Sequence, residues 1–399
     1  MSNPLKNNEK RCWIIKFKKD VDPKKHTFHR SLNVKCLCGE VYHGMICSAT
    51  KSDLEKNLDP NIIESFEEDS IVQITALKSR KILGTNDLKA LAVQPIGPFI
   101  SRIGTDRSSQ KVGDGQGSLE NRKNINVFVV DTGIALHGDL NVVGGRNFTS
   151  SNPAAWKDEN GHGTHVAGII GAKDNSFGIV GVAPGVRLWA VRVLGSNGNG
   201  SVSNIMSALK WILEGRGSIW TGFGIVNMSL GGNASAPLDT AVNNLINNGL
   251  IVCAAAGNNS VNVSSKSPAR VLNAITVGAT GPNPSYNTLA SYSNYGSIID
   301  ILAPGSNIYS TYLHNNYASL SGTSMACPVV SGTVALMLST TPITGGNSLA
   351  FVKNVIAILI TMSSYTNPKC YDGTTGKNPR ISVPPTRPST GISIWSGSY

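Results

Sequence analysis

The chain has 399 residues, of which 40% are hydrophobic and 42 are glycine, and its formal net charge is +11. This length allows one to three domains, and the composition is typical of a globular protein with many loops. The charge favours acidic partners, but there is no zinc-finger, P-loop or RNA-binding signature. Lys and Arg are interleaved with acids in the N-terminal third, so we expect a solvated face and no nucleic-acid partner.

Neither a signal peptide nor a membrane span is expected. The first ten residues contain no apolar core segment, and no apolar run reaches transmembrane length. These observations favour a protein without a membrane partner that is intracellular or exported by a non-standard route, and they leave its compartment open. The seven cysteines are an odd number and do not form a dense disulfide framework.

Residues 1–74 have the pattern of a small α+β domain. We predict a strand at 13–17, a helix at 52–58 that ends before Asp59-Pro60, and paired strands at 62–66 and 71–74. Residues 75–102 lack strong periodicity and contain the polar stretch Lys78-Ser79-Arg80-Lys81, so we interpret them as a linker.

Residues 103–365 alternate between strands and helices. Strands are predicted at 125–130, 187–194, 224–228, 250–255 and 274–277, and helices at 162–171, 204–214, 238–247, from 324 onward, and 349–362. This alternation predicts an α/β fold with a doubly wound, mostly parallel sheet. The tail, residues 366–399, is rich in Pro, Ser, Thr and Gly and is expected to be irregular.

Three motifs of this region point to acyl transfer. Asp131 ends an apolar strand in Asp-Thr-Gly, His162 opens a helix in His-Gly-Thr-His-Val-Ala-Gly, and Ser324 precedes an apolar run in Gly-Thr-Ser-Met-Ala. Ser324 alone would be interpreted as a helix cap. Together, however, an Asp, a His and a Ser at the ends of strands or the starts of helices are the parts of a catalytic triad.

The order of these motifs along the chain and the residues in them resemble those of the subtilisin-like serine proteases, and the proteinase K-like branch is the nearest match. The resemblance implies that Ser324 is the nucleophile, His162 the general base and Asp131 the group that orients the imidazole. It assigns His165 to packing. Asn258 aligns with the asparagine that stabilises the oxyanion, together with the backbone N–H of Ser324.

The same resemblance implies a substrate cleft. Its two binding strands correspond to Gly198, Asn199 and Gly200, and to Ser229, Leu230, Gly231 and Gly232, although either set could form an ordinary turn. The wall of the pocket for P1, the residue before the cleaved bond, corresponds to Ala254, Ala255, Ala256 and Gly257. This wall is uncharged and favours a broad or apolar P1 preference.

No cofactor is expected for the chemistry, but the resemblance implies a structural calcium site. Its ligands would be the carboxylate of Asp300 and the carbonyls of Leu272 and Ala274. A single carboxylate is also compatible with a hydrogen-bonded turn and no metal.

Residues 1–74 resemble an inhibitory propeptide, with an unrelated small domain as the alternative. The expected protein is thus a monomeric serine endopeptidase that acts on polypeptides. It would be made as a zymogen that is inhibited by its own N-terminal domain and cleaves itself between about Ile74 and Val93. Cleavage at Lys78–Lys81 by another protease is a second possibility. The alternative function is a catalytically silent binding protein; the filled catalytic positions favour the enzyme.

Overall fold

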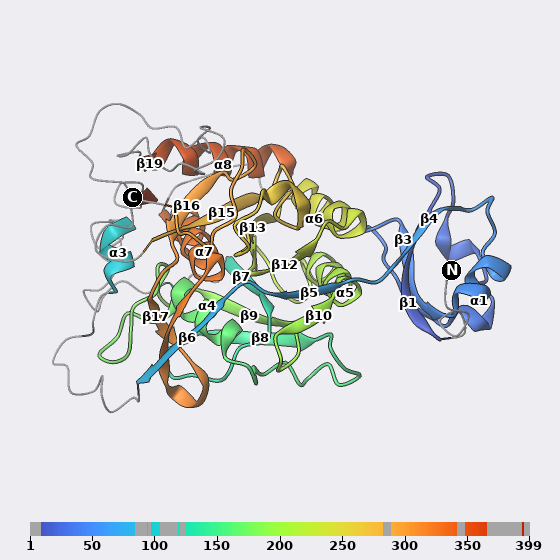
Figure 1. Ribbon diagram of the computed structural model, residues 1–399. Coiled ribbons are helices and arrows are strands. Elements are labelled where there is room, and N and C mark those ends of the chain that lie inside the picture. The colour runs from blue at the N-terminus through green and yellow to red at the C-terminus, as the bar shows by residue number, and fades with distance from the viewer. Residues whose placement is uncertain are drawn as a thin grey trace.

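The computed structural model describes residues 9–83, 94, 97–103, 119, 124–281, 289–340, 348–364 and 393–394 (Figure 1). Its main body is built on one sheet of seven strands, and every neighbouring pair in this sheet is parallel. In spatial order the strands are β16 (Ile301–Pro304), β15 (Ile275–Thr280), β13 (Ile251–Ala255), β11 (Phe223–Met228), β7 (Ile125–Asp131), β9 (Arg187–Arg192) and β8 (Val142–Asn147). The predicted α/β fold with a parallel sheet is confirmed.

Apolar residues on both faces explain why the sheet is covered by helices. All seven residues of β7 and all five of β13 are buried, as expected for parallel strands with helices on both sides. The helices are α4 (His162–Gly171), α5 (Val202–Glu214), α6 (Ala236–Asn247), α7 (Thr323–Thr340) and α8 (Leu349–Met362), with a short α3 (Pro98–Ile103). Helix α7 packs on α4 and on β11, β13 and β15, whereas α5 packs on α6.

The strand order places β7 at a switch point. After β7 the chain builds β8 and β9 on one side, and then β11, β13, β15 and β16 in succession on the other. Open α/β sheets bind their ligands at such a point, beyond the carboxyl ends of the strands. Asp131, the last residue of β7, lies there.

The N-terminal residues form a separate antiparallel sheet, seen at one side of the main body in Figure 1. Its strand order is β2 (Val34–Leu37), β3 (Gly44–Ala49), β1 (Arg11–Phe17) and β4 (Ile63–Glu68), with the helix α1 (Lys51–Asn57). One face packs on its own core, which includes Trp13, Ile15 and Leu54. Ile14 and Ile46, on the other face, belong to the core of the main body. The predicted strand and helix of this region are therefore present.

Two carboxylates also join this sheet to the main body. Asp69 accepts hydrogen bonds from the Ser203 backbone N–H (2.9 Å) and hydroxyl (2.6 Å), at the start of α5. Glu67 accepts one from the hydroxyl of Ser235 (3.2 Å), the N-cap residue of α6. Carboxylates are favourable at these positions because helix N-termini carry unpaired N–H groups and partial positive charge.

The predicted pairing between residues 62–66 and 71–74 is wrong. Strand β4 pairs with β1, whereas β5 (Ile71–Ile74) leaves the N-terminal sheet and pairs with β10 (Asn199–Ser201) and β12 (Leu230–Asn233). The next segment also differs from a plain linker. Its strand β6 (Leu77–Leu83) pairs with β18 (Tyr317–Ser321), which in turn pairs with β17 (Ile308–Thr311). Local periodicity does not reveal these strands because their partners lie far along the chain.

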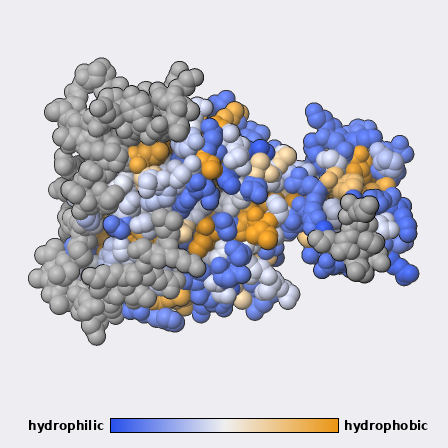
Figure 2. Space-filling model, viewed as in Figure 1, coloured by the Kyte–Doolittle hydropathy of each residue, from blue (hydrophilic) through white to orange (hydrophobic). Residues whose placement is uncertain are grey.

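The surface seen in Figure 2 is mostly hydrophilic, with hydrophobic residues in small separate patches. Within the described ranges, no helix combines the length and the apolar character needed to cross a bilayer. The cysteines of these ranges, six in number, are all free thiols.

Candidate active site

Asp131 and His162 meet at the carboxyl end of the central strand. The Asp131 Oδ1 atom lies 2.7 Å from His162 Nδ1, and both side chains are buried. His162 is the first residue of α4, and Gly163 brings this helix close to the strand. A Cβ at Gly163 would lie 2.1 Å from the carbonyl oxygen of Gly133, so a larger residue would push the imidazole away from the carboxylate.

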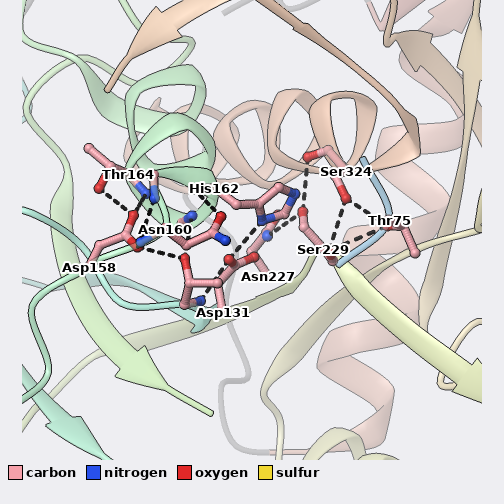
Figure 3. Close-up of polar contacts among 12 residues, drawn as sticks. Thr75, Asp131, Asp158, Asn160, His162, Thr164, Asn227, Ser229 and Ser324 are labelled. Carbon is pink, nitrogen blue, oxygen red and sulfur yellow. Dashed lines mark hydrogen bonds and ion pairs between the residues drawn. The ribbon is translucent and has the colours of Figure 1, made fainter. Parts of the chain in front are cut away.

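A second carboxylate fixes the start of α4 (Figure 3). Asp158 accepts hydrogen bonds from the backbone N–H (3.0 Å) and hydroxyl (2.6 Å) of Thr164, and from the hydroxyl of Thr132 (2.8 Å). Thr132 in turn accepts from the N–H of Gly163 (2.9 Å). This network holds α4 against the residue that follows Asp131, and so sets the position of His162.

His165 lies one helical turn further along and has a different environment. Its Nε2 atom is 2.9 Å from the carbonyl oxygen of Ala318, and the ring is fully buried. Burial lowers the pKa of His165 to about 3, so the ring is neutral over the physiological range. These contacts are those of a packed structural histidine.

Ser324 lies in the first turn of α7, and its backbone is held by a neighbouring serine. Ser229 donates its hydroxyl to the carbonyl oxygen of Ser324 (3.0 Å) and accepts the Ser324 hydroxyl at its own carbonyl oxygen (2.9 Å). The Ser324 Oγ atom is also 2.6 Å from Thr75 Oγ1. The Nε2 atom of His162 is buried and has no hydrogen-bond partner within the described chain. Figure 3 shows His162 between Asp131 and Ser324.

The carbonyl group of Thr75 lies between two hydrogen-bond donors. Its oxygen accepts from the side-chain amide of Asn258 (2.6 Å) and from the backbone N–H of Ser324 (3.2 Å). The carboxamide of Asn258 is oriented by Thr323, whose N–H and hydroxyl both donate to Asn258 Oδ1 at 2.9 Å. The two donors predicted to bind an oxyanion thus converge on one peptide carbonyl of this same chain.

Thr75 is placed there by β5, which lies between the two predicted binding strands. Asn199 and Gly200 pair with β5 on one side, and Leu230, Gly231 and Gly232 on the other. Gly198 and Ser229 supply the next bonds: their carbonyl oxygens accept from the N–H groups of Ile74 (3.1 Å) and Thr75 (3.4 Å). The segments that the sequence analysis assigned to a cleft therefore hold an extended peptide in antiparallel register.

A cavity of about 210 Å³ borders Thr75. Of the residues assigned to the P1 wall, 255–257 line this cavity, whereas Ala254 is buried in β13 and is not part of the lining. The lining also includes Asn233 and Lys266, which the sequence analysis missed. Lys266 belongs to the two-residue strand β14 (Lys266–Ser267), and only the pairing of β14 with β12 brings it to this cavity.

The predicted metal ligands have ordinary protein partners. Asp300 accepts from the backbone N–H of Thr276 (2.8 Å), and burial raises the pKa of Asp300 to about 7. Ala274 is buried, and Leu272 is 77% exposed. Clusters of three or more His, Cys, Asp or Glu that could hold a metal do not occur in the described ranges. Calcium at Asp300 stays a prediction.

A denser group of oxygen atoms lies elsewhere, around Gln94. The side-chain amide of Gln94 donates to the carbonyl oxygens of Lys173, Phe177 and Ile179 at 2.7–2.9 Å. The buried carboxylate of Asp139 accepts from Asn175 (3.1 Å) and from the N–H of Ile179 (3.0 Å) beside it. Burial raises the pKa of Asp139 to about 7. Carbonyl and carboxylate oxygens of this kind suit a Ca²⁺ ion. Sequence patterns do not reveal this group, because most of its oxygen atoms belong to the backbone.

Comparison with known proteins agrees with this geometry. The subtilase family model matches residues 122–375. Subtilisin Savinase of Lederbergia lenta is 48% identical over 219 residues, which cover 55% of this chain and 77% of that protein. The thermostable alkaline protease of Halalkalibacterium halodurans is 39% identical over 302 residues, covering 72% and 78%. The crystal structure of a cold-adapted subtilisin-like serine proteinase matches with a TM-score of 0.59 and 32% identity, covering 75% of this chain and 97% of that one.

Proposed function

This chain belongs to the subtilase family and is a serine-type endopeptidase that acts on polypeptides, and from that premise we propose that it is a zymogen that cleaves its own Thr75–Ala76 bond. In this proposal Ser324 is the nucleophile, His162 the general base and Asp131 the carboxylate that orients the imidazole. The chemistry needs no cofactor.

One observation carries the proposal, namely that the Thr75 carbonyl oxygen accepts from both Asn258 and the Ser324 N–H beside the Ser324 hydroxyl. Attack by Ser324 Oγ on this carbonyl carbon places negative charge on the oxygen, where the two donors stabilise it. The Ser324 proton moves to His162 and then to the nitrogen of Ala76 as the C–N bond breaks. Water hydrolyses the resulting ester and frees Ser324.

The Ser324 hydroxyl has to turn before it can react. It now donates to the carbonyl oxygen of Ser229, while the buried Nε2 of His162 lacks a partner within the described chain. Rotation of the Ser324 side chain toward His162 would satisfy both the base and the nucleophile. The bond being cut belongs to the same molecule, so the effective concentration of substrate is high.

After cleavage, residues 1–75 would remain bound as an inhibitor. Strand β5 would still pair with β10 and β12, and Asp69 would still bind the N-terminus of α5. An unrelated N-terminal domain would have no reason to present its last strand at Ser324. The uncharged wall at 255–257 supports the acceptance of apolar P1 residues. The proteinase K-like assignment stays a prediction, since the relatives named above carry subtilisin and alkaline protease names.

The test uses the purified full chain. We expect N-terminal sequencing to find a new terminus at Ala76, and a fluorophosphonate probe to label Ser324 once the N-terminal fragment has been removed. A folded, processed protein that never labels would instead be a silent binding protein. A terminus after Lys78–Lys81 would indicate processing by a different protease.

We also propose that Ca²⁺ binds the oxygen group around Gln94 and Asp139. Binding to the folded state alone would stabilise the protein, by about 2.7 kcal/mol at a free concentration 100 times the Kd. We expect the thermal midpoint to rise from chelator to millimolar Ca²⁺, and this rise to shrink in Asp139→Asn. The variant Asp300→Asn tests the second candidate site. Equal midpoints of the unmodified chain in the two conditions would contradict both sites.

A further inference from the structure

The cavity beside Thr75 is larger than Thr75 requires. The short threonine side chain directs its hydroxyl to Ser324, and the cavity of about 210 Å³ that it borders is also lined by Lys266. A longer side chain at this position would therefore extend into space that is now empty. The residues that line the cavity then decide which long side chains are favoured.

The register of the strands puts Lys266 on the same side of the sheet as the Thr75 side chain. Residues opposite each other in antiparallel strands share a face, and so do residues two apart in one strand. Lys266 lies opposite Asn233, Asn233 lies two residues from Gly231, and Gly231 lies opposite Gln73. Thr75 follows Gln73 by two residues, so the alternation directs both side chains toward the face of Lys266.

The charge of Lys266 is not neutralised by a carboxylate. Its ammonium group donates to the neutral Oδ1 atom of Asn233 (3.3 Å), and no ion pair involves it within the described ranges. The neighbouring cation, Arg270, is already paired with Asp239. Lys266 is the only charged residue among the described residues that line the cavity, and it is half-buried. A partly desolvated cation of this kind favours an anion in the cavity.

We propose that Lys266 is a specificity-determining residue: in a pocket that also accepts apolar P1 side chains, it makes the enzyme cleave polypeptides after glutamate better than after the isosteric glutamine. The inference rests on the proposed function, in which Thr75 occupies the P1 position. Glutamate is favoured over aspartate because its carboxylate lies further from the main chain. Cleavage of the precursor after a short threonine does not need this contact, since the intramolecular bond is already held at Ser324.

The main experiment measures kcat/KM of the processed enzyme on p-nitroanilides of Val-Gln-Ile-Xaa, the sequence of residues 72–74 followed by Glu, Gln, Leu or Lys. We expect the Glu substrate to exceed the Gln substrate by about tenfold at low salt, as for a charge-assisted contact that is partly screened. This ratio should fall toward one at 1 M NaCl. In Lys266→Gln the ratio should be close to one, and in Lys266→Glu the Lys substrate should exceed the Glu substrate.

Lys353→Gln is the matched control, because Lys353 lies exposed on α8 and away from the cavity, and it should keep the ratio of the unmodified enzyme. If the unmodified enzyme cuts the Gln and Leu substrates but shows no preference for Glu, the role of Lys266 is wrong and the proposed function stands. If it cuts none of the four, the proposed function itself fails.

A second measurement covers the case in which a Lys266 variant does not mature. In the full-length chain, the precursor Thr75→Glu should cleave itself faster than Thr75→Gln, and this difference should vanish when each is combined with Lys266→Gln. Equal rates of Thr75→Glu and Thr75→Gln in the otherwise unmodified chain would overturn the inference.

Discussion

The variant Ser324→Ala should remain a full-length, folded precursor. The Ser324 hydroxyl is the group that attacks the Thr75 carbonyl in the proposed reaction, and alanine has no hydroxyl to do so. In subtilisin, a relative of this chain, loss of the corresponding serine lowers kcat by about 10⁶-fold, and we expect an effect of this order. The rate of appearance of the 76–399 fragment, followed on gels, measures it.

Two further arms separate cleavage within one molecule from cleavage between molecules. A trace of active enzyme added to Ser324→Ala tests cleavage in trans, and dilution of the unmodified precursor should leave its rate of self-cleavage unchanged if the step is intramolecular. Ser264→Ala, an exposed serine far along the chain from α7, is the control that should process normally. Cleavage of purified Ser324→Ala with no protease present would exclude Ser324 as the agent.

His162→Ala and His165→Ala should have opposite effects, although the two residues lie in one helix. His162→Ala removes the proposed base, and we expect turnover to fall by about 10⁶-fold, again the order measured for subtilisin. His165→Ala removes a buried ring that is bonded to the carbonyl oxygen of Ala318. It should cost about 1–3 kcal/mol of stability and leave turnover per probe-labelled site nearly unchanged.

The pH dependence of stability gives a second readout for His165. Burial lowers its pKa to about 3 in the folded protein, against about 6.5 in an unfolded chain. Between these values the unfolded state binds one more proton, so the free energy of unfolding falls as the pH falls from about 6.5 to 3. This part of the acid sensitivity should be missing in His165→Ala. A variant His165→Ala that is stable but inactive would mean that the assignment of the two histidines is reversed.

The sequence by itself determined the fold class and the candidate triad. The pattern of apolar residues is a local signal, so it predicted the strand at 125–130 and the helix at 204–214 directly. The alternation of such strands and helices along the chain then predicted a parallel sheet. Asp131, His162 and Ser324 each stand in a short motif at the end of a strand or the start of a helix. Such ends meet at one edge of a parallel sheet, so their convergence followed from the fold class.

Only the tertiary structure decided which bond of the chain lies at Ser324, and what charge lines the pocket next to it. Strand β5 looked like a partner of β4, because local pattern does not encode which distant strand a segment pairs with. Its place between β10 and β12 is what singles out Thr75 from the range 74–93. Lys266 was one lysine among many in the sequence. It reaches the cavity only because its short strand pairs with β12, a contact between segments that the helix α6 and the strand β13 separate in the sequence.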